Sequence, residues 1–206
     1  SFLKAGVVAS DRITTVSPTY ARELMLPQFG MGFEGLLQSR KSDLLGIING
    51  IDLDVWNPET DPAITKSYSE KTLVHKATNR AALEKRFNLT ANPDAPLFCV
   101  ISRLTEQKGL DLLLQALPAL VGRGARLALL GSGDKGLEDA FRRAATNYQG
   151  AVGTIIGYDE HLSHLMQAGA DAILVPSRVE PCGLTQLYGL RYWTLPVVAR
   201  AGGLAD

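Results

Sequence analysis

Cysteine is scarce in this sequence: its 206 residues include only two, Cys99 and Cys182. Two cysteines cannot build a disulfide scaffold, and so low a number is typical of a reducing compartment. A net charge is also lacking, because 21 lysines and arginines balance 21 aspartates and glutamates. This balance argues against binding to nucleic acid or to an anionic membrane surface, since both need a basic excess.

Long apolar runs are missing as well. The richest one, Leu110 to Val121, is interrupted by polar residues and a proline, and it is shorter than the roughly 20 apolar residues that cross a bilayer. The start of the chain shows no charged-then-apolar targeting pattern. We therefore expect a soluble, cytoplasmic protein with no membrane partner and no nucleic-acid partner.

What is present is the composition of a packed globular protein. Apolar residues make up 46% of the chain and charged residues 20%, which excludes a disordered chain. The length fits one or two domains. Because the sequence opens on Ser1 without an initiator methionine and stops just after Gly202-Gly203, we expect a piece of a longer protein.

From residue 96 onward, short apolar runs alternate with segments of helical period. Strands are expected at 96–102, 125–130, 152–156, 171–175 and 195–199, and helices at 110–120, 136–148, 160–168 and 183–192. Strands that alternate with single helices predict βαβ units. The expected fold class is therefore α/β, a Rossmann-like parallel sheet with helices on both faces.

The first part of the chain differs. It offers two strands, at 12–17 and 44–48, and a helix from Pro18 to Met25 that Ser17 caps. Two strands cannot form a domain, so residues 1–51 are interpreted as the C-terminal part of a preceding Rossmann-like domain. Residues 52–69 are rich in Pro, Asp, Asn and Thr and predict a linker. Residues 70–206 then form the second domain, truncated at its end.

A helix expected over 71–87 carries five lysines and arginines. We interpret these cations as a solvated face rather than an anion-binding patch. The opposite, buried face is expected to contain Leu73, Ala77, Ala81 and Phe87.

Two cations follow the first buried strand of the second domain. Arg103 and Lys108 belong to one loop at the strand's carboxyl end, where ligands of open parallel sheets bind. Arginine offers a planar fork to phosphate oxygens and lysine a mobile charge, so a diphosphate is a suitable ligand. Two surface cations with carboxylate partners are an equally good interpretation.

The next strand is followed by a formal G-x-G-x-x-G, formed by Gly131, Gly133 and Gly136. Such a spacing suits a dinucleotide pyrophosphate at a helix N-terminus and would indicate an NAD-dependent dehydrogenase. The motif follows the second strand of the domain rather than the first, and the acidic residue expected after the next strand is at best Asp159. We therefore favour a glycine-rich turn.

The segment after the strand at 171–175 carries a carboxylate, Glu180, and then Gly183, Leu184 and Thr185 at the start of a helix. Amides and a hydroxyl at a helix start bind anions, whereas a carboxylate suits a sugar hydroxyl. Together with the cations above, this pattern indicates a sugar-diphosphate carrier. Cys182 lacks a histidine in its segment that would activate it as a nucleophile.

The two histidines of the helix at 160–168, His161 and His164, are three residues apart, but no third ligand accompanies them. They therefore do not form a metal pattern.

Several strings resemble one family in order and spacing along essentially the whole chain. They are Ile48-Asn49-Gly50-Ile51-Asp52 with Val55-Trp56-Asn57-Pro58, Ser102-Arg103-Leu104-Thr105 with Gln107-Lys108-Gly109, Ile156-Gly157-Tyr158 with Leu162 to Asp171, and Glu180 to Gln186. The family is that of bacterial glycogen synthases and plant starch synthases.

This resemblance implies a GT-B fold and a retaining transfer of glucose from ADP-glucose to the non-reducing end of an α-1,4-glucan such as glycogen or starch. It implies no cofactor and no metal, and a plastid location for a plant-type source. The implied catalytic residues are Arg103, Lys108 and Glu180. The implied donor-binding residues are Asn49, Gly157, Tyr158, Cys182, Gly183, Leu184 and Thr185.

The resemblance also implies roles for these residues. Arg103 and Lys108 hold the diphosphate, Leu184 and Thr185 bind the distal phosphate, and Tyr158 lies against adenine. Glu180 binds the donor glucose hydroxyls, Cys182 and Gly183 shape the sugar pocket, and Asn49 reaches the donor sugar. The displacement would take place on the front face, without an enzyme nucleophile.

The sequence departs from the family pattern at a few positions. Glu106 stands where a tryptophan is common and places a negative charge beside Arg103 and Lys108. Gly189 and Trp193 stand where alanine and glycine are usual, and Trp193 is expected to press on the neighbouring strand. The Lys-Thr-Gly-Gly loop and the catalytic His and Asp of the family belong to an N-terminal domain outside this sequence, so the isolated chain is expected to be inactive.

Three alternatives remain open on the sequence. One is a related GT-B transferase of the sucrose or trehalose type with another nucleotide sugar. The others are a non-catalytic nucleotide-binding module, favoured by Glu106, and the NAD-dependent dehydrogenase.

Overall fold

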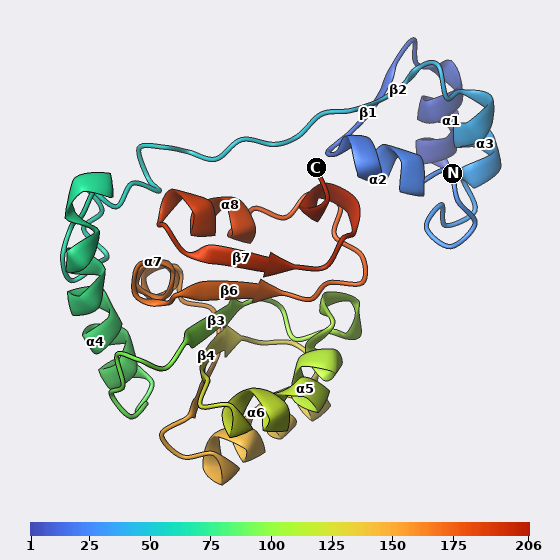
Figure 1. Ribbon diagram of the computed structural model, residues 1–206. Helices are drawn as coiled ribbons and strands as arrows, with labels where there is room; N and C mark the ends of the chain where they lie inside the picture. The colour runs from blue at the N-terminus through green and yellow to red at the C-terminus, as the bar shows by residue number, and fades with distance from the viewer. The chain divides into compact units, whose positions relative to one another are not determined.

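The computed structural model describes residues 1–206, and the contacts within the chain define two compact units. The first unit contains Ser1–Gly50, Val179–Leu184 and Ala199–Asp206, and the second contains Ile51–Arg178 and Thr185–Val198 (Figure 1). None of the helices combines the length and apolar character that a membrane span requires.

The first unit contains two short parallel strands and three helices. The strands are β1 (Ile13–Thr15) and β2 (Leu44–Gly46), and the helices are α1 (Phe2–Ala9), α2 (Pro18–Glu23) and α3 (Glu34–Ser39), with a 3₁₀ turn, η3 (Gly202–Leu204). Both strands and α2 confirm the sequence-based expectation, and the Ser17 side chain caps α2 by accepting from the Tyr20 N–H at 2.8 Å. Helix α1 was not expected, because it buries no residue and shows no two-sided pattern.

The second unit is built on a five-stranded sheet in which every neighbouring pair is parallel. Its strands are β3 (Leu97–Ile101), β4 (Arg126–Gly131), β5 (Val152–Ile156), β6 (Ala172–Val175) and β7 (Leu195–Val198). The order is β5-β4-β3-β6-β7. The chain therefore adds strands on one side of β3 and then returns to the other side, which creates a topological switch point between β3 and β6.

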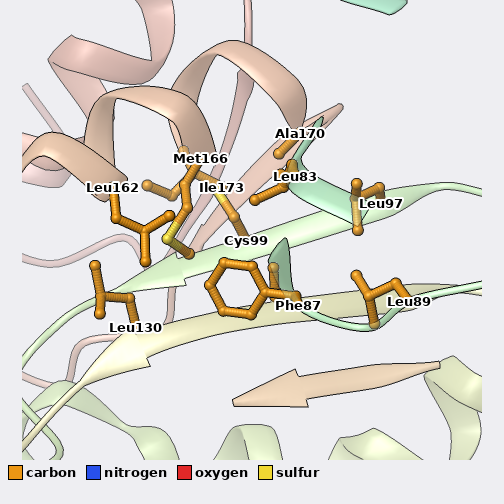
Figure 2. Packing of buried hydrophobic residues seen from close by; sticks show 11 residues of the cluster. Leu83, Phe87, Leu89, Leu97, Cys99, Leu130, Leu162, Met166, Ala170 and Ile173 are labelled. Atoms are coloured by element: carbon orange, nitrogen blue, oxygen red, sulfur yellow. The ribbon is translucent and has the colours of Figure 1, made fainter. Parts of the chain in front are cut away.

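Helices cover both faces of this sheet. They are α4 (Lys76–Arg86), α5 (Leu110–Gly122), α6 (Lys135–Asn147), α7 (Glu160–Gly169) and α8 (Thr185–Arg191), with the 3₁₀ segments η1 (Glu70–His75) and η2 (Glu106–Lys108). On one face Met166 of α7 packs with Cys99 of β3, as Figure 2 shows, and on the other Phe141 of α6 packs with Val100. Strand β3 is apolar throughout because its two faces are both covered.

Cys99 lies in the core, within the strand that the sequence predicts at 96–102. It is fully buried, and burial raises the pKa of its thiol to about 12.

The buried face of α4 matches the prediction only in part. Phe87 is buried as expected, but Leu73, Ala77 and Ala81 are exposed, and the helix buries Leu83 together with two polar residues, Asn79 and Glu84. The prediction was wrong for the three exposed residues because it assigned the small and apolar residues to the interior and every charge to solvent.

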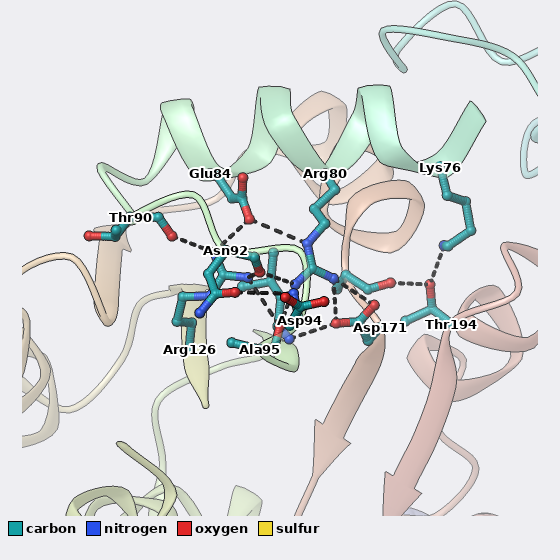
Figure 3. Close-up of polar contacts among 12 residues, drawn as sticks. Lys76, Arg80, Glu84, Thr90, Asn92, Asp94, Ala95, Arg126, Asp171 and Thr194 are labelled. Atoms are coloured by element: carbon teal, nitrogen blue, oxygen red, sulfur yellow. Dashed lines mark hydrogen bonds and ion pairs between the residues drawn. The ribbon is translucent and has the colours of Figure 1, made fainter. Parts of the chain in front are cut away.

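Three charged residues of α4, Lys76, Arg80 and Glu84, point toward the sheet (Figure 3), whereas Lys85 and Arg86 are exposed. Arg80 donates two hydrogen bonds to the carboxylate of Asp171, at 2.8 and 2.6 Å, and one to Glu84 at 3.3 Å. Glu84 also accepts from Arg126 of β4 at 2.5 Å. Asp171 in turn accepts from the Leu97 N–H at 2.7 Å. This network attaches α4 to the amino ends of β3, β4 and β6.

The segment at 52–69, expected as a linker, has an irregular backbone but is well packed within the second unit. Trp56, Ile64 and Tyr68 are buried in one cluster with Tyr192. The Tyr68 hydroxyl donates to the Tyr192 carbonyl at 2.8 Å. Residues 52–69 are thus part of the body of this unit.

Candidate functional site

A pocket of about 370 Å³ opens at the carboxyl ends of β3, β4 and β5, beside the switch point. Three strand-to-helix turns line it, at 101–103, 130–132 and 157–160. Side chains of α7 and α8 and the indole of Trp56 complete the wall. Its volume lies within the range of about 300–1,000 Å³ that is typical of small-molecule sites.

Four of the ten predicted site residues line this pocket: Arg103, Gly157, Tyr158 and Thr185. Tyr158 is 85% exposed, and its hydroxyl donates to Glu160 at 2.8 Å. This hydrogen bond and the charge of Glu160 raise the pKa of Tyr158, so the phenol stays neutral at physiological pH. Its uncovered ring offers a flat surface on which a planar group can stack.

Lys108 does not line the pocket, but its loop is held in a defined conformation. The Arg178 N–H donates to the Gln107 carbonyl at 2.9 Å, and the Arg178 side chain donates to the Glu106 carbonyl at 2.7 Å. The guanidinium also binds both carboxylate oxygens of Asp111, at 2.6 and 2.7 Å. This hydrogen bonding, together with the charges of Asp111 and Glu106, raises the pKa of Arg178. The charge of Glu106 thus acts on Arg178.

Gly109 ends the same loop in a left-handed conformation, with φ 67°. A Cβ atom there would overlap the carbonyl oxygen of Pro176. The turn after β3 therefore packs directly on the turn after β6, and only glycine permits this approach.

The glycines of the 131–136 turn have a packing role. A Cβ atom on Gly131 would overlap the Ser102 carbonyl oxygen, and one on Gly133 would overlap that of Leu104. Leu104 and Gly133 also form a bridge between the two turns. Helix α6 begins at an ordinary cap, in which Asp134 accepts from the Leu137 N–H at 3.1 Å. This geometry supports the interpretation as a glycine-rich turn.

Sequence reasoning missed the role of Trp56. Its indole is stacked between His164 on one face, with ring centroids 3.8 Å apart, and Tyr188 on the other, at 3.7 Å. The imidazole Nδ1 of His164 lies 2.7 Å from a carboxylate oxygen of Asp61. The string that contains Trp56 was recognised only as part of a family pattern, because nothing local predicts contacts to α7 and α8.

Asp61 is hydrogen-bonded to His164, one of the rings of this stack. Burial opposes its ionisation, but hydrogen bonds from His164, Tyr192 and the Ala63 N–H outweigh that effect and hold the pKa of Asp61 below its ordinary value. Burial and the hydrogen bond to Asp61 raise the pKa of Tyr192. The aspartate is therefore an anion that accepts hydrogen bonds from these three groups.

Gln167 connects the pocket wall to the start of α8. Its side chain is fully buried and lines the pocket, and its Nε2 donates to the Thr185 carbonyl at 3.1 Å. This bond fixes the first residue of α8, whose amide and hydroxyl were predicted to bind phosphate.

The other five predicted residues belong to the first unit. Glu180 is buried, and its carbonyl accepts from the Gly203 N–H at 3.0 Å. Cys182 is buried too, and Gly183 has a left-handed φ of 70°. The residues of this group are Asn49, Glu180, Cys182, Gly183 and Leu184. Their predicted roles stay predictions.

The pocket combines a guanidinium at one strand end, a serine hydroxyl at the next and an exposed aromatic ring at the third. A guanidinium binds phosphate, hydroxyls bind sugars, and an aromatic face stacks on a base. No group of three or more His, Cys, Asp or Glu side chains in residues 1–206 is arranged to hold a metal ion. The arrangement is suited to a nucleotide.

Comparison with known proteins agrees with this chemistry. Residues 82–206 match the family described as glycosyl transferases group 1, and residues 1–39 match the starch synthase catalytic domain. The chain is 69% identical to a glycogen synthase of Roseobacter denitrificans and 63% identical to one of Novosphingobium aromaticivorans. Both alignments cover the whole chain but only 43% and 42% of those proteins. The chain thus spans less than half of the relatives' length.

Among solved structures, the catalytic domain of starch synthase IV from Arabidopsis thaliana, bound to ADP and acarbose, is similar with a TM-score of 0.92 and 37% identity. The similarity covers 99% of this chain and 42% of that chain. A glycosyltransferase from Rickettsia africae ESF-5, at 18% identity and a TM-score of 0.65 over 98% of this chain and 48% of that one, shares the fold. These similarities confirm the expected α/β class of GT-B type.

Proposed function

Because the chain belongs to the glycosyl transferases group 1, we propose that the full-length protein is an ADP-glucose-dependent glycogen synthase. It transfers glucose from ADP-glucose to the non-reducing end of an α-1,4-glucan. The observation that carries this proposal is the pocket at the switch point, where Arg103, Tyr158 and Thr185 converge from separate turns. The whole-chain similarity to glycogen synthases at up to 69% identity supports the choice of donor and acceptor.

Arg103 acts on the leaving group. As the bond between glucose C1 and the diphosphate oxygen breaks, negative charge develops on the ADP phosphates. A planar guanidinium placed at the strand end stabilises this charge more strongly than it stabilises the uncleaved donor. Lys108, on the same loop, adds a second positive charge.

Tyr158 and Thr185 hold the ends of the nucleotide. The exposed ring of Tyr158 stacks on adenine, and the amide and hydroxyl of Thr185 at the start of α8 bind the distal phosphate. Gln167 keeps Thr185 in place through its carbonyl. The stacked rings of Trp56 and Tyr188 close one side of the pocket.

The transfer takes place on one face of the sugar. The bond from C1 to the acceptor hydroxyl oxygen forms on the side from which the diphosphate departs, and the hydroxyl proton passes to the leaving phosphate oxygen. The configuration at C1 is thereby retained without a protein nucleophile. The reaction needs no metal ion or cofactor, and the acceptor is a neutral polysaccharide.

The test is a transfer assay with the full-length protein, glycogen as primer and radiolabelled ADP-glucose, UDP-glucose or GDP-glucose as donor. We expect incorporation from ADP-glucose at a kcat/KM at least tenfold above that of the other donors. Equal use of UDP-glucose would point to a related transferase. Tight binding of NAD without any transfer would contradict the proposal.

A further inference from the structure

The indole of Trp56 forms part of the wall of the nucleotide pocket, but the groups that orient it lie outside the pocket. The imidazole of His164 covers one face of the indole. The ring of Tyr192 meets the indole edge-on, with centroids 6.1 Å apart and 75° between the planes. Neither His164 nor Tyr192 lines the pocket, and neither does Asp61, which is bonded to both. These three residues can therefore influence a ligand only through residues of the wall.

The carboxylate of Asp61 holds the two rings that contact the indole. Its side chain is 1% exposed and that of His164 is 6% exposed. One carboxylate oxygen, Oδ2, lies 2.7 Å from Nδ1 of His164 and also accepts from the Tyr192 hydroxyl. Because an ionised carboxylate only accepts hydrogen bonds, the Nδ1 atom carries a proton and donates it. The other oxygen, Oδ1, accepts from the Ala63 N–H at 2.8 Å, so the carboxylate itself is tied to the backbone.

The hydrogen bond between Asp61 and His164 fixes what stacking leaves free. Two stacked rings can slide over each other or rotate about their common normal at little cost, since dispersion contacts have no strong direction. A charge-assisted hydrogen bond depends steeply on distance and angle. The bond to Asp61 therefore sets the orientation of the imidazole, and the imidazole sets the plane on which Trp56 lies.

Stability alone does not account for a buried carboxylate at this place. Burying a charge costs free energy, and well-packed apolar side chains are often at least as stabilising as a buried ionic pair. The cluster around Trp56 already contains such side chains, Ile64 and Ala168 among them. Directional polar bonds that are fully satisfied specify one arrangement of the groups they join, which is what the wall of a binding pocket requires.

The same carboxylate also acts on helix α8. Tyr192 follows the last residue of α8 directly, and Tyr188, one turn earlier, stacks on the second face of the indole. The helix begins at Thr185, which lines the nucleotide pocket together with Tyr188 and Trp56. Asp61 thus lies at the junction of the parts that carry these three pocket residues.

We propose that Asp61 and His164 are positioning residues for the donor nucleotide, which hold Trp56 and Tyr188 in the wall of the pocket before the nucleotide binds. The identity of the nucleotide rests on the proposed function, whereas the positioning rests on the contacts described above. A wall that is fixed in advance lowers the entropic cost of binding. The effect therefore falls on donor affinity, and neither side chain takes part in the transfer step.

The test uses the full-length protein and two substitutions that divide the contacts of the imidazole. His164→Phe keeps an aromatic face against the indole and removes the hydrogen bond to Asp61. His164→Asn removes the aromatic face and keeps an N–H near the position of Nδ1. We expect each substitution to raise the calorimetric Kd for ADP and the KM for ADP-glucose about tenfold. The kcat and the KM for glycogen should stay within about twofold of those of the unmodified protein.

A double-mutant cycle tests whether His164 acts through the indole. In a Trp56→Ala background, His164→Phe should change the Kd for ADP by less than about twofold, because the group through which it acts is gone. A tenfold change that persists in this background would overturn the assignment of His164 as a positioning residue for Trp56.

Two control variants separate donor affinity from general effects. His161→Asn replaces an exposed histidine of the same helix. Leu117→Ala creates a cavity in the core of α5, where the side chain is 2% exposed and does not line the pocket. We expect Leu117→Ala to lower the melting temperature, and both controls to bind ADP as the unmodified protein does.

An unchanged Kd for ADP in both His164 variants would overturn the inference, and so would an equal loss of affinity in Leu117→Ala. Weaker binding in His164→Asn alone would contradict the role of Asp61. If the unmodified protein transfers glucose from ADP-glucose but the His164 variants bind ADP equally well, only this inference fails. If the unmodified protein binds no ADP, the proposed function fails and the inference fails with it.

Discussion

The indole of Trp56 lies face to face with the imidazole of His164, with ring centroids 3.8 Å apart and 14° between the planes. Tyr188 covers the opposite face of the indole at 3.7 Å. Trp56 and Tyr188 both line the nucleotide pocket. A residue from the irregular segment at 52–69 thus joins α7 to α8 and forms part of the pocket wall.

Replacing Trp56 by alanine should damage both stability and donor binding. The substitution leaves a cavity between two rings, and we expect the free energy of unfolding to fall by about 3 kcal/mol or more. The KM for ADP-glucose should rise at the same time. Denaturant titration and initial-rate kinetics measure the two effects. Val55→Ala, at a neighbouring side chain that is 47% exposed, should change stability by less than about 0.5 kcal/mol, and equal stability of the two variants would contradict the role of the stack.

Lys76 should give stability a distinctive pH dependence. Burial lowers its pKa from 10.5 to about 8, so between these pH values the unfolded chain binds more protons than the folded one. Stability contributed by this group therefore rises with pH, by about 1 kcal/mol between pH 7 and 9. The neutral amine can still donate to the Tyr192 carbonyl and the Thr194 hydroxyl.

The measurement is the difference in free energy of unfolding between the unmodified protein and Lys76→Met at pH 7 and at pH 9. We expect the difference to shift in favour of the unmodified protein at the higher pH. Lys85→Met, on the exposed side of the same helix, should show no such shift. A difference that stays constant for Lys76→Met would show that Lys76 is not buried as described.

The glycine-rich turn allows a comparison within one motif. Gly131→Ala places a Cβ atom on the Ser102 carbonyl oxygen, so backbone must move, and we expect a loss of about 1–3 kcal/mol in stability with a higher KM for ADP-glucose. Gly136→Ala meets only the Asp134 carboxylate oxygen, at 3.0 Å, and gains helix propensity. It should be neutral or slightly stabilising. Thermal unfolding distinguishes the two, and an equally tolerated Gly131→Ala would refute the packing role.

The parallel sheet was predictable because its signal is local. Each of the strands β3 to β7 is a short apolar run, and a helical segment follows each of β3 to β6. All five strands begin and end within one residue of their predicted ranges. Two covered faces make a strand apolar at every position, as Cys99 and Val100 show by packing on opposite sides. The strand order follows from connection rules rather than from any single residue.

The face of α4 was not predictable from the same kind of signal. Helical periodicity assigns an arginine to the exposed face of a helix. The Arg80 guanidinium is instead paired with Asp171, 91 residues further along the chain. Burial of a charge depends on such a distant partner. Helix α1 was missed for the opposite reason, since none of its residues is buried.

The pocket residues that directly follow a strand were predictable from the sequence. Arg103 and Tyr158 follow β3 and β5 closely. Because the carboxyl ends of parallel strands meet at the same edge of a sheet, both residues line the same pocket. Trp56 is different, because it comes from an irregular segment and reaches the pocket through contacts with α7 and α8. Gln167 and Ser163 line the pocket from α7. They belong to the family string from Leu162 to Asp171, but nothing in their own chemistry marks them as pocket residues.

Transfer by an Arg103→Ala variant of the full-length protein tests the central claim most directly. We predict that kcat/KM for ADP-glucose falls by about 10²–10³, because the guanidinium acts where the leaving charge develops. Arg123→Ala, at an exposed arginine after α5, should leave kcat/KM within about twofold. A kcat/KM for Arg103→Ala equal to that of Arg123→Ala would contradict the assignment of this pocket as the nucleotide site.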